Sequence, residues 1–144
     1  MIPPPDQVDR NRIRDELDRN LFVEAGAGAG KTSSLVGRIV ELVRCGVAIG
    51  SIAAITFTEK AAADLRHRLR GALQQAATDT AEQPEHALFG SALDDLDHAP
   101  IGTLHAFARR LLNEFPVESS TVIAFICLLG TGAVLFKKKM HNIK

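Results

Sequence analysis

A run of small residues between two apolar segments is the feature that most constrains how this chain can fold. Residues 25–32 read Ala-Gly-Ala-Gly-Ala-Gly-Lys-Thr, with apolar residues 21–23 before them and the periodic segment 35–40 after them. This order predicts a buried strand, a tight turn and a helix, which is the context of a phosphate-binding loop. In such a loop, small residues let successive backbone N–H groups point at a polyphosphate, and the following helix N-terminus adds partial positive charge.

The predicted loop comprises Ala25, Gly26, Ala27, Gly28, Ala29, Gly30, Lys31 and Thr32. Lys31 is expected to reach the β- and γ-phosphates of a nucleotide, and the Thr32 hydroxyl to bind Mg²⁺. The first position of the general pattern is Gly, where this chain has Ala25. The alternative interpretation is a Gly- and Ala-rich turn that happens to end in a Lys-Thr pair.

Length and composition place few limits on function. The 144 residues suit one domain and carry 17 basic and 17 acidic side chains, so the net charge is zero. A nucleic acid would therefore have to meet a local basic patch. Cys45 and Cys127 share no ligand spacing with any His, which predicts two buried thiols in a reducing compartment and no metal cluster. The first residues lack the apolar core of a secretory signal, so we expect a cytoplasmic protein.

Hydrophobic periodicity predicts alternating helices and strands. We expect a helix over 6–19, a buried strand over 20–24, a helix from 35 that ends at Gly46 in a left-handed conformation, and a strand over 51–57. Thr58 then caps a helix whose apolar positions keep helical spacing: Ala62, Leu65, Leu69, Leu73 and Ala76. A strand–helix–strand–helix order with a phosphate loop after the first strand predicts a doubly wound α/β domain with a parallel sheet.

The segment from 78 to 100 breaks this pattern. It holds several acidic residues, no Lys or Arg and only a weak helical pattern over 86–97, so we expect an exposed insertion. After it, Thr103 is expected to cap a helix over 104–115 that stops at Pro116. Three arginines lie close together in the sequence: Arg66, Arg68 and Arg70. We expect them to lie on a solvated helix face, and a DNA-facing edge is the alternative.

Residues 119–144 differ in composition from the rest. They contain four Lys and no Arg, whereas the preceding part uses Arg as its cation apart from Lys31 and Lys60. An uncharged run over 122–136 followed by three lysines resembles the membrane-anchoring end of a Gram-positive wall protein, although the sortase signal is absent. We therefore expect an apolar C-terminal helix. It would either contact a membrane through 121–139, which would make the protein membrane-associated, or result from a chimeric or frameshifted gene junction. A buried strand or helix that completes the sheet is the alternative.

Three separated motifs, taken together, resemble one family. They are residues 24–32, then Ile-Thr-Phe-Thr-Glu-Lys-Ala-Ala at 55–62, then Gly-Thr-Leu-His-Ala-Phe at 102–107. In this combination the chain resembles the N-terminal ATPase domain of UvrD/Rep-like superfamily 1 DNA helicases, including relatives of the RecB and AddA type. Ala25 supports the resemblance, because this family commonly has Ala there. The chain would then comprise a partial helicase domain over 1–118 and the apolar segment over 119–144.

The resemblance implies a truncated RecA-like domain of the P-loop NTPase class that binds ATP with Mg²⁺ and contacts single-stranded DNA. The implied DNA contacts come from the second and third motifs: Thr56, Phe57, Thr58, Lys60, Thr103, His105 and Phe107. Hydroxyls and helix N-termini hold phosphates, and aromatic faces stack on bases without reading sequence. For Phe57 and Phe107, packing in the core is the alternative. An upstream Gln that reads adenine is typical of the family, and Gln7 is the candidate.

Missing parts of the motor limit the activity we expect. Hydrolysis needs an acidic pair at the end of a later strand to hold Mg²⁺ and activate water, and Asp94–Asp95 has no apolar strand before it. The family's second motor domain is also missing. We therefore expect a fragment that binds ATP and, weakly, DNA without hydrolysis or unwinding. Two other classes stay open: another phosphate-loop enzyme such as a small kinase, and a membrane-tethered interaction protein.

Overall fold

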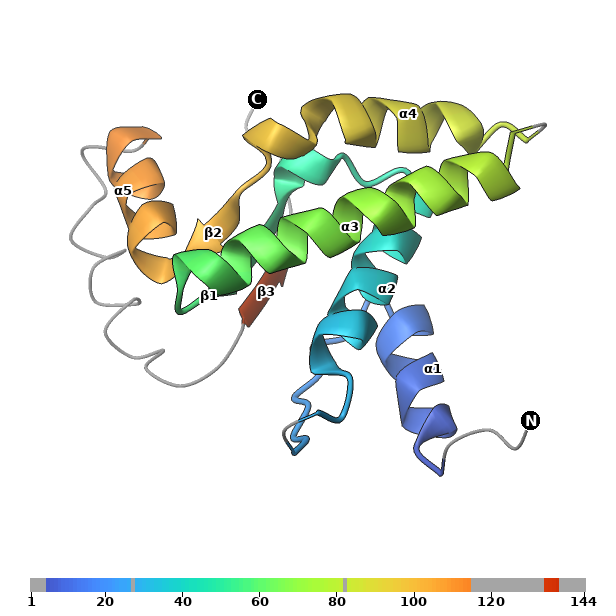
Figure 1. The fold of residues 1–144 in the computed structure, drawn as a ribbon, viewed down its shortest axis with the longest axis horizontal. Coiled ribbons are helices and arrows are strands. Elements are labelled where there is room, and N and C mark those ends of the chain that lie inside the picture. The colour runs from blue at the N-terminus through green and yellow to red at the C-terminus, as the bar shows by residue number, and fades with distance from the viewer. Residues whose placement is uncertain (1–4, 27, 82, 115–133, 138–144) are drawn as a thin grey trace. The chain divides into compact units, whose positions relative to one another are not determined.

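The computed structural model describes residues 5–26, 28–81, 83–114 and 134–137, which form helices and short strands (Figure 1). The helices are α1 (Gln7–Asp15), α2 (Lys31–Arg44), α3 (Glu59–Asp79), α4 (His86–Asp95) and α5 (Leu104–Glu114). The strands are β1 (Ile52–Thr56), β2 (Ile101–Thr103) and β3 (Val134–Lys137), and single 3-10 turns lie at η1 (Ile49–Ser51) and η2 (Leu96–His98). Contacts divide the chain into two compact units: residues 1–47 with 68–94, and residues 48–67 with 95–144.

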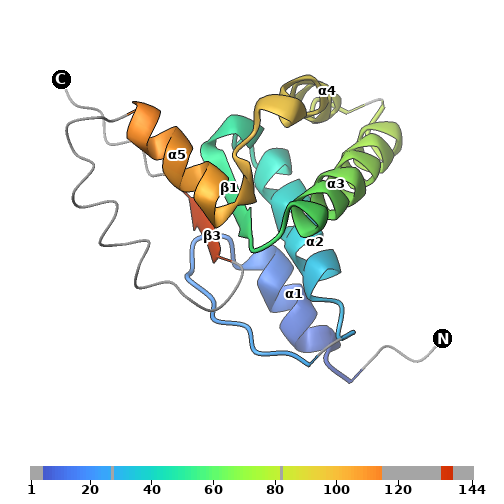
Figure 2. The same cartoon turned by 60° about the vertical axis from the view of Figure 1, so that its left-hand side comes forward.

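The second unit holds a three-stranded sheet in the order β2–β1–β3. β1 and β2 are parallel, with Thr56 opposite Thr103, whereas β3 runs antiparallel along the other edge of β1. β1 is buried from Ile52 to Ile55, as its apolar run predicts for a central strand. α5 packs against the β1–β2 pair (Figure 2). The parallel pair agrees with the predicted α/β class, but the described sheet is mixed and not wholly parallel as predicted, because β3 enters it in the opposite direction.

Hydroxyl caps begin α3 and α5 at the predicted positions. The Ala61 N–H donates to Thr58 Oγ1 at 3.1 Å, and the Ala106 N–H donates to Thr103 Oγ1 at 3.2 Å. Such caps satisfy N–H groups that the first turn of a helix leaves unpaired. The apolar positions predicted for the first of these helices are all buried: Ala62, Leu65, Leu69, Leu73 and Ala76.

α2 supplies a large share of the buried side chains in the first unit. They recur at helical spacing: Val36, Ile39, Leu42 and Val43. Gly46 follows the helix with a φ of +82°, and the Val47 N–H donates to the Leu42 carbonyl at 3.0 Å, which is the predicted left-handed cap. α1 lies against α2 (Figures 1 and 2), although it ends at Asp15 and not at residue 19 as predicted.

The prediction of a buried strand over 20–24 is wrong for this structure. Phe22 is 94% exposed and Val23 is 45% exposed, and the segment is not in a strand. β1 pairs with β2 on one edge and with β3 on the other, so neither of its edges is left for a further strand. An apolar run becomes a stable strand only where a partner satisfies its backbone N–H and C=O groups.

The segment over 78–100 lies outside the sheet as predicted, but the prediction that it is exposed is wrong. Residues 86–95 form α4, and Phe89 and Ala92 on this helix are buried. The Arg44 guanidinium lies 5.3 Å from the centre of the Phe89 ring, which is a cation–π distance. The acidic side chains that suggested exposure, such as Asp94, lie on the solvent face of a helix whose other face packs. Charge composition therefore did not predict how much of the segment is buried.

Most of the apolar run over 122–136 lies outside the described residues. Its end forms β3, so Val134–Lys137 is a strand and not the predicted continuation of a helix. Over the described ranges, no helix combines the length and apolar character needed to cross a membrane. Cys45 is exposed, contrary to the predicted buried thiol, because it follows the last buried turn of α2. Cys127 lies outside the described residues.

Candidate functional site

The predicted phosphate loop leads directly into α2, which begins at Lys31. Gly28 and Gly30 have φ angles of +78° and +83°, a left-handed conformation that Gly adopts without strain. Gly30 is the N-cap residue of α2, so the loop ends where helix N–H groups lack intrahelical partners. Ala27 lies outside the described residues. The turn and the helix of the predicted motif are therefore present, and the strand expected before them over 20–24 does not form.

Lys31 folds back over the loop that precedes it. Its Nζ atom donates to the carbonyl of Ala25 at 2.6 Å and to the carbonyl of Gly26 at 2.7 Å. An ammonium group has three N–H donors, so these two bonds leave one for a phosphate oxygen. The Lys31 side chain is exposed, and Thr32 follows it in the first turn of α2. The two residues predicted to hold phosphate and Mg²⁺ thus lie at the same helix end.

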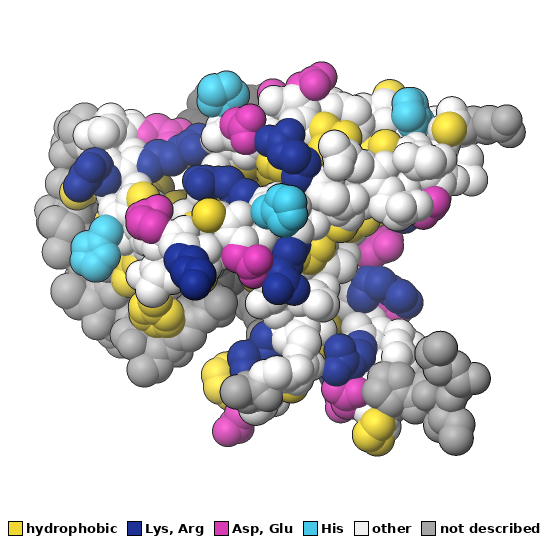
Figure 3. Space-filling view, in the orientation of Figure 1, with side chains coloured by type: hydrophobic (Ala, Val, Ile, Leu, Met, Phe, Trp, Pro, Cys, Tyr) yellow, Lys and Arg dark blue, Asp and Glu magenta, His cyan; other side chains and the backbone are white. Residues whose placement is uncertain are grey.

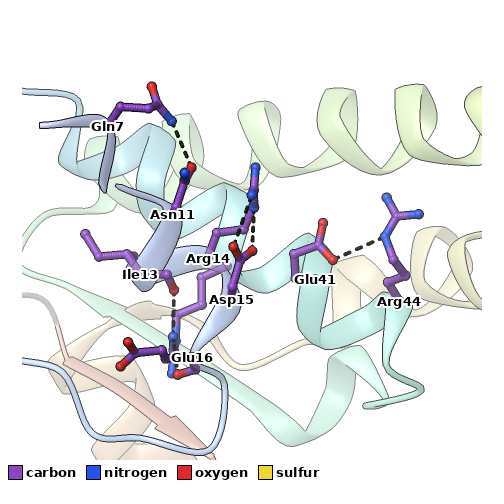
Figure 4. Close-up of polar contacts among 9 residues, drawn as sticks. Gln7, Asn11, Ile13, Arg14, Asp15, Glu16, Glu41 and Arg44 are labelled. Atoms are coloured by element: carbon purple, nitrogen blue, oxygen red, sulfur yellow. Dashed lines mark hydrogen bonds and ion pairs between the residues drawn. The ribbon is translucent and has the colours of Figure 1, made fainter. Parts of the chain in front are cut away.

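α1 meets the loop through Arg10, and the adenine-reading role predicted for Gln7 stays a prediction. Arg10 Nη2 donates to the Ala29 carbonyl at 2.9 Å and to Asp6 Oδ2 at 2.8 Å. Gln7 Nε2 instead donates to Asn11 Oδ1 at 2.9 Å within α1 (Figure 4). Sequence reasoning missed Arg10, although its place one turn after Gln7 on the same helix was a usable signal. The Arg10 guanidinium also holds the pKa of the Asp6 carboxyl below its ordinary value.

Arg38 on α2 holds the end of α1. Its guanidinium donates to the carbonyls of three residues: Ile13 at 2.6 Å, Glu16 at 3.0 Å and Arg19 at 3.1 Å. Burial lowers the pKa of Arg38 from its ordinary value, and nearby carboxylates offset part of that effect. A guanidinium offers five donors in a fixed fork, so one side chain can bind several carbonyls at once. Arg38 therefore fastens α1 to α2 without touching the loop carbonyl that Arg10 binds.

The second and third motifs meet at the carboxyl edge of the β1–β2 pair. Thr56 and Thr103 are the last residues of the two strands and lie opposite each other. α3 begins at Glu59 and α5 begins at Leu104, so two helix N-termini follow this edge. The sheet thus brings together the DNA contacts that the resemblance implied for 56–60 and 103–107, and both sets belong to the second unit.

Thr103 is buried, and its hydroxyl forms hydrogen bonds with other residues of the protein. It is 6% exposed, and its hydroxyl donates to Glu59 Oε1 at 3.0 Å while it accepts the capping bond from Ala106. Arg66 adds a second link between α3 and β2, because its guanidinium donates to the carbonyl of Ile101. Thr103 and Glu59 therefore fix the third motif against the second. Sequence reasoning singled out Thr103 as a DNA contact and did not identify Glu59 or Arg66 as its supports.

The other predicted DNA residues differ in accessibility. Phe57 is 56% exposed, so its ring is not a core side chain in the described structure. The Thr56 hydroxyl donates to the Thr58 carbonyl at 3.0 Å, which tightens the turn between β1 and α3. On the face that Figure 3 presents, Lys and Arg side chains lie among Asp and Glu side chains and form no broad basic patch. Among the remaining predicted contacts, Thr58, Lys60 and His105 are exposed. Phe107 is half-buried.

Comparison with known proteins places most of the chain in one family. The UvrD/REP helicase N-terminal domain matches residues 7–139. The chain is 41% identical over 101 residues to an ATP-dependent helicase/nuclease subunit of Levilactobacillus brevis, and 37% identical over 103 residues to the exonuclease/helicase subunit RexA of Lactococcus lactis subsp. cremoris. These alignments cover 69% and 72% of this chain but 8% and 9% of the relatives, so the chain spans less than a tenth of their length. No solved structure matches it significantly.

Proposed function

The chain belongs to the UvrD/REP helicase N-terminal domain family, and from that premise we propose that it is the nucleotide-binding portion of an ATP-dependent DNA helicase. In this proposal residues 25–32 bind ATP with Mg²⁺, and the carboxyl edge of β1 and β2 contacts single-stranded DNA. The observation that carries the proposal is the position of the Lys31 ammonium. It folds back to the start of the loop, binds the carbonyls of Ala25 and Gly26, and keeps a third N–H donor for a phosphate.

The loop offers the groups that a triphosphate and its metal need. Two left-handed glycines turn the backbone immediately before α2, which lets N–H groups of the loop face one side. Lys31 supplies a positive charge beside them, and Thr32 supplies a hydroxyl oxygen, a ligand type that Mg²⁺ prefers. Bound ATP with Mg²⁺ would supply the phosphoryl group whose transfer drives such motors. The residues of this chain bind and orient that group.

The proposed DNA surface uses hydroxyls, a cation and aromatic rings. Thr58 and Lys60 are exposed at the start of α3, where the helix N-terminus favours a phosphate. Phe57 exposes more than half of its surface and can stack on a base without reading its identity. His105, exposed in the first turn of α5, can donate to a phosphate. These contacts suit single-stranded DNA of any sequence.

Binding without hydrolysis is the activity we propose for the chain by itself. Neither described parallel strand ends in an acidic pair, since β1 is followed by Phe57-Thr58 and β2 by Leu104-His105. Asp94 and Asp95 end helix α4 and are exposed. A carboxylate that activates water has to sit at the nucleotide, at the end of a strand that presents it. The greater length of the relatives leaves room for such residues elsewhere in the full protein.

Titration with a fluorescent ATP analogue and Mg²⁺ tests the nucleotide site. Lys31→Ala should weaken binding at least about tenfold, because charge-assisted hydrogen bonds contribute about 1.5–3 kcal/mol. Lys60→Ala, which removes an exposed lysine outside the loop, is the control and should bind the analogue as the unaltered chain does. Equal affinities for Lys31→Ala and the unaltered chain would show that residues 25–32 do not form the nucleotide site.

A labelled oligo(dT) tests the DNA surface separately. Phe57→Ala should weaken binding about tenfold, because stacking of one base contributes about 1–3 kcal/mol. Phe22→Ala is a matched control, since Phe22 is the more exposed of the two rings and belongs to the other unit. If both substitutions have the same effect, exposed apolar area and not a site at the strand edge explains the binding.

A further inference from the structure

One arginine outside the predicted loop makes direct contact with it. Arg10, on α1, donates from Nη2 to the Ala29 carbonyl at 2.9 Å and to the Asp6 carboxylate at 2.8 Å. Its Nη1 atom lies 2.9 Å from the position that a Cβ atom would take at Gly30. The guanidinium is thus held by a carboxylate on one side and lies against the last turn of the loop on the other.

The bond to Ala29 determines the direction of a neighbouring N–H group. A peptide unit is planar and trans, so its C=O and its N–H point in opposite directions. The carbonyl of Ala29 and the N–H of Gly30 belong to the same peptide unit. When Arg10 holds that carbonyl, the Gly30 N–H is turned away from Arg10, and a flip of the unit would break a charge-assisted bond.

Lys31 acts in the same way at the start of the loop. Its ammonium binds the carbonyls of Ala25 and Gly26. Two cationic side chains therefore hold three carbonyls of the loop. If these carbonyls rotated toward a bound phosphate, their oxygens would repel it. We propose that Arg10 is a positioning residue for the nucleotide, which keeps the Ala29–Gly30 peptide turned so that its N–H faces the phosphate. This inference rests on the proposed nucleotide site.

The contact between Arg10 and the loop is not needed to hold α1 in place. The end of α1 is held by Arg38, which binds three carbonyls between residues 13 and 19. Arg10 is about one-third exposed, and within the described ranges it bonds to Asp6 and to the loop itself. The two arginines have separate roles: Arg38 joins α1 to α2, and Arg10 joins α1 to the loop. Replacing Arg10 should thus change nucleotide affinity more than stability.

The experiment compares Arg10→Gln, Arg10→Lys and Arg12→Gln in the full chain. Arg12 lies on the same helix, is exposed and bonds Glu16 at 3.0 Å, so it is the matched control. We expect Arg10→Gln to bind ATP and ADP with Mg²⁺ about three- to tenfold more weakly, because the loop loses a positioning hydrogen bond while the nucleotide loses none of its direct contacts. Arg10→Lys, which keeps a cationic donor, should recover part of the affinity. Arg12→Gln should bind both nucleotides normally, and the melting temperatures of the Arg10 variants should match that of the unaltered chain.

Each other outcome overturns a distinct statement. If Arg10→Gln binds both nucleotides normally while Lys31→Ala does not, the inference fails and the proposed function stands. A loss for ATP with none for ADP would mean that Arg10 touches the γ-phosphate, which contradicts a positioning role. A fall in melting temperature that accompanies the loss, without recovery in Arg10→Lys, would make the role structural. If the unaltered chain binds neither nucleotide, the proposed function itself fails.

Discussion

The proposed nucleotide loop and the carboxyl edge of the β1–β2 pair both lead into a helix, yet they are held in different ways. In the loop, cationic side chains bind backbone carbonyls: Lys31 binds Ala25 and Gly26, and Arg10 binds Ala29. At the strand edge, a parallel ladder and two hydroxyl caps fix the backbone. A bond from one side chain to one carbonyl can shift when a ligand binds nearby, whereas the bonds of a strand ladder break only together. The loop is therefore the part that can adapt to a ligand, and the strand edge is fixed beforehand.

The apolar segments before the two turns differ as well. Residues 52–55 of β1 are buried, while Phe22 and Val23, before the loop, are exposed. Both segments read as strands in the sequence, but β1 has a partner on each edge. Apolar composition therefore identifies a candidate strand, and pairing decides whether that strand forms.

The largest expected effect comes from substituting one apolar residue in each segment. Ile52→Ala should lower the free energy of unfolding by about 2–5 kcal/mol, since a buried side chain leaves a cavity in a central strand. Phe22→Ser should change it by less than about 0.5 kcal/mol, as surface substitutions usually do. Urea denaturation followed by circular dichroism measures both. A loss of several kcal/mol in Phe22→Ser would mean that the segment packs in solution, and the contrast with β1 would disappear.

Local patterns predicted much of this structure. The five apolar positions of α3, the caps at Thr58 and Thr103 and the left-handed Gly46 are encoded within a few residues of sequence, because helix spacing and cap chemistry are local properties. The same holds for the loop glycines and for the Lys31–Thr32 pair. These features could be identified without knowing what lies beside them.

Other features depend on contacts between residues far apart in the sequence, which local patterns do not predict. Arg10 reaches Ala29 across 19 positions, and Thr103 reaches Glu59 across 44. Bonds from a side chain to a distant partner have no spacing rule, so sequence reasoning did not predict the Thr103–Glu59 bond and passed over Arg10. The failed strand at 20–24 has the same origin, since strand pairing is also non-local.

Arg38→Gln should have the next largest effect and extends the comparison to α1. It removes the guanidinium that binds three carbonyls, and we expect unfolding to become easier by about 1–3 kcal/mol. Arg12→Gln is the control because Arg12 is exposed and pairs with a single carboxylate, Glu16. Thermal denaturation measures the difference. Equal melting temperatures for the two variants would show that α1 is held mainly by apolar contacts.

Thr103→Val tests the fixed strand edge with a smaller expected effect. Valine keeps the shape and loses the hydroxyl, so the bond to Glu59 and the cap on α5 both disappear, which we expect to cost about 1 kcal/mol. Oligo(dT) affinity should fall with it, because the third motif is then less well held against the second. Thr103→Ser, which keeps the hydroxyl, should restore both stability and affinity. A Thr103→Val chain of full stability that still loses affinity would make Thr103 a direct DNA contact, as the resemblance implied.

The smallest expected effect concerns pH and tests the ion pair that holds Arg10 beside the loop. Arg10 lowers the pKa of Asp6 in the folded chain below its value when unfolded, about 3.9. Between these two pKa values the unfolded chain binds more protons, so the ion pair stabilises the fold above about pH 4 and this contribution disappears as the pH falls through the lower value. Asp6→Asn should show a slightly shallower loss of stability between about pH 5 and pH 2, measured by urea midpoints, and the difference should shrink in about 1 M salt because exposed charges are screened. Parallel profiles at low salt would mean that the Asp6–Arg10 pair does not persist in solution, and Arg10 would then bind the Ala29 carbonyl without a carboxylate to hold its guanidinium.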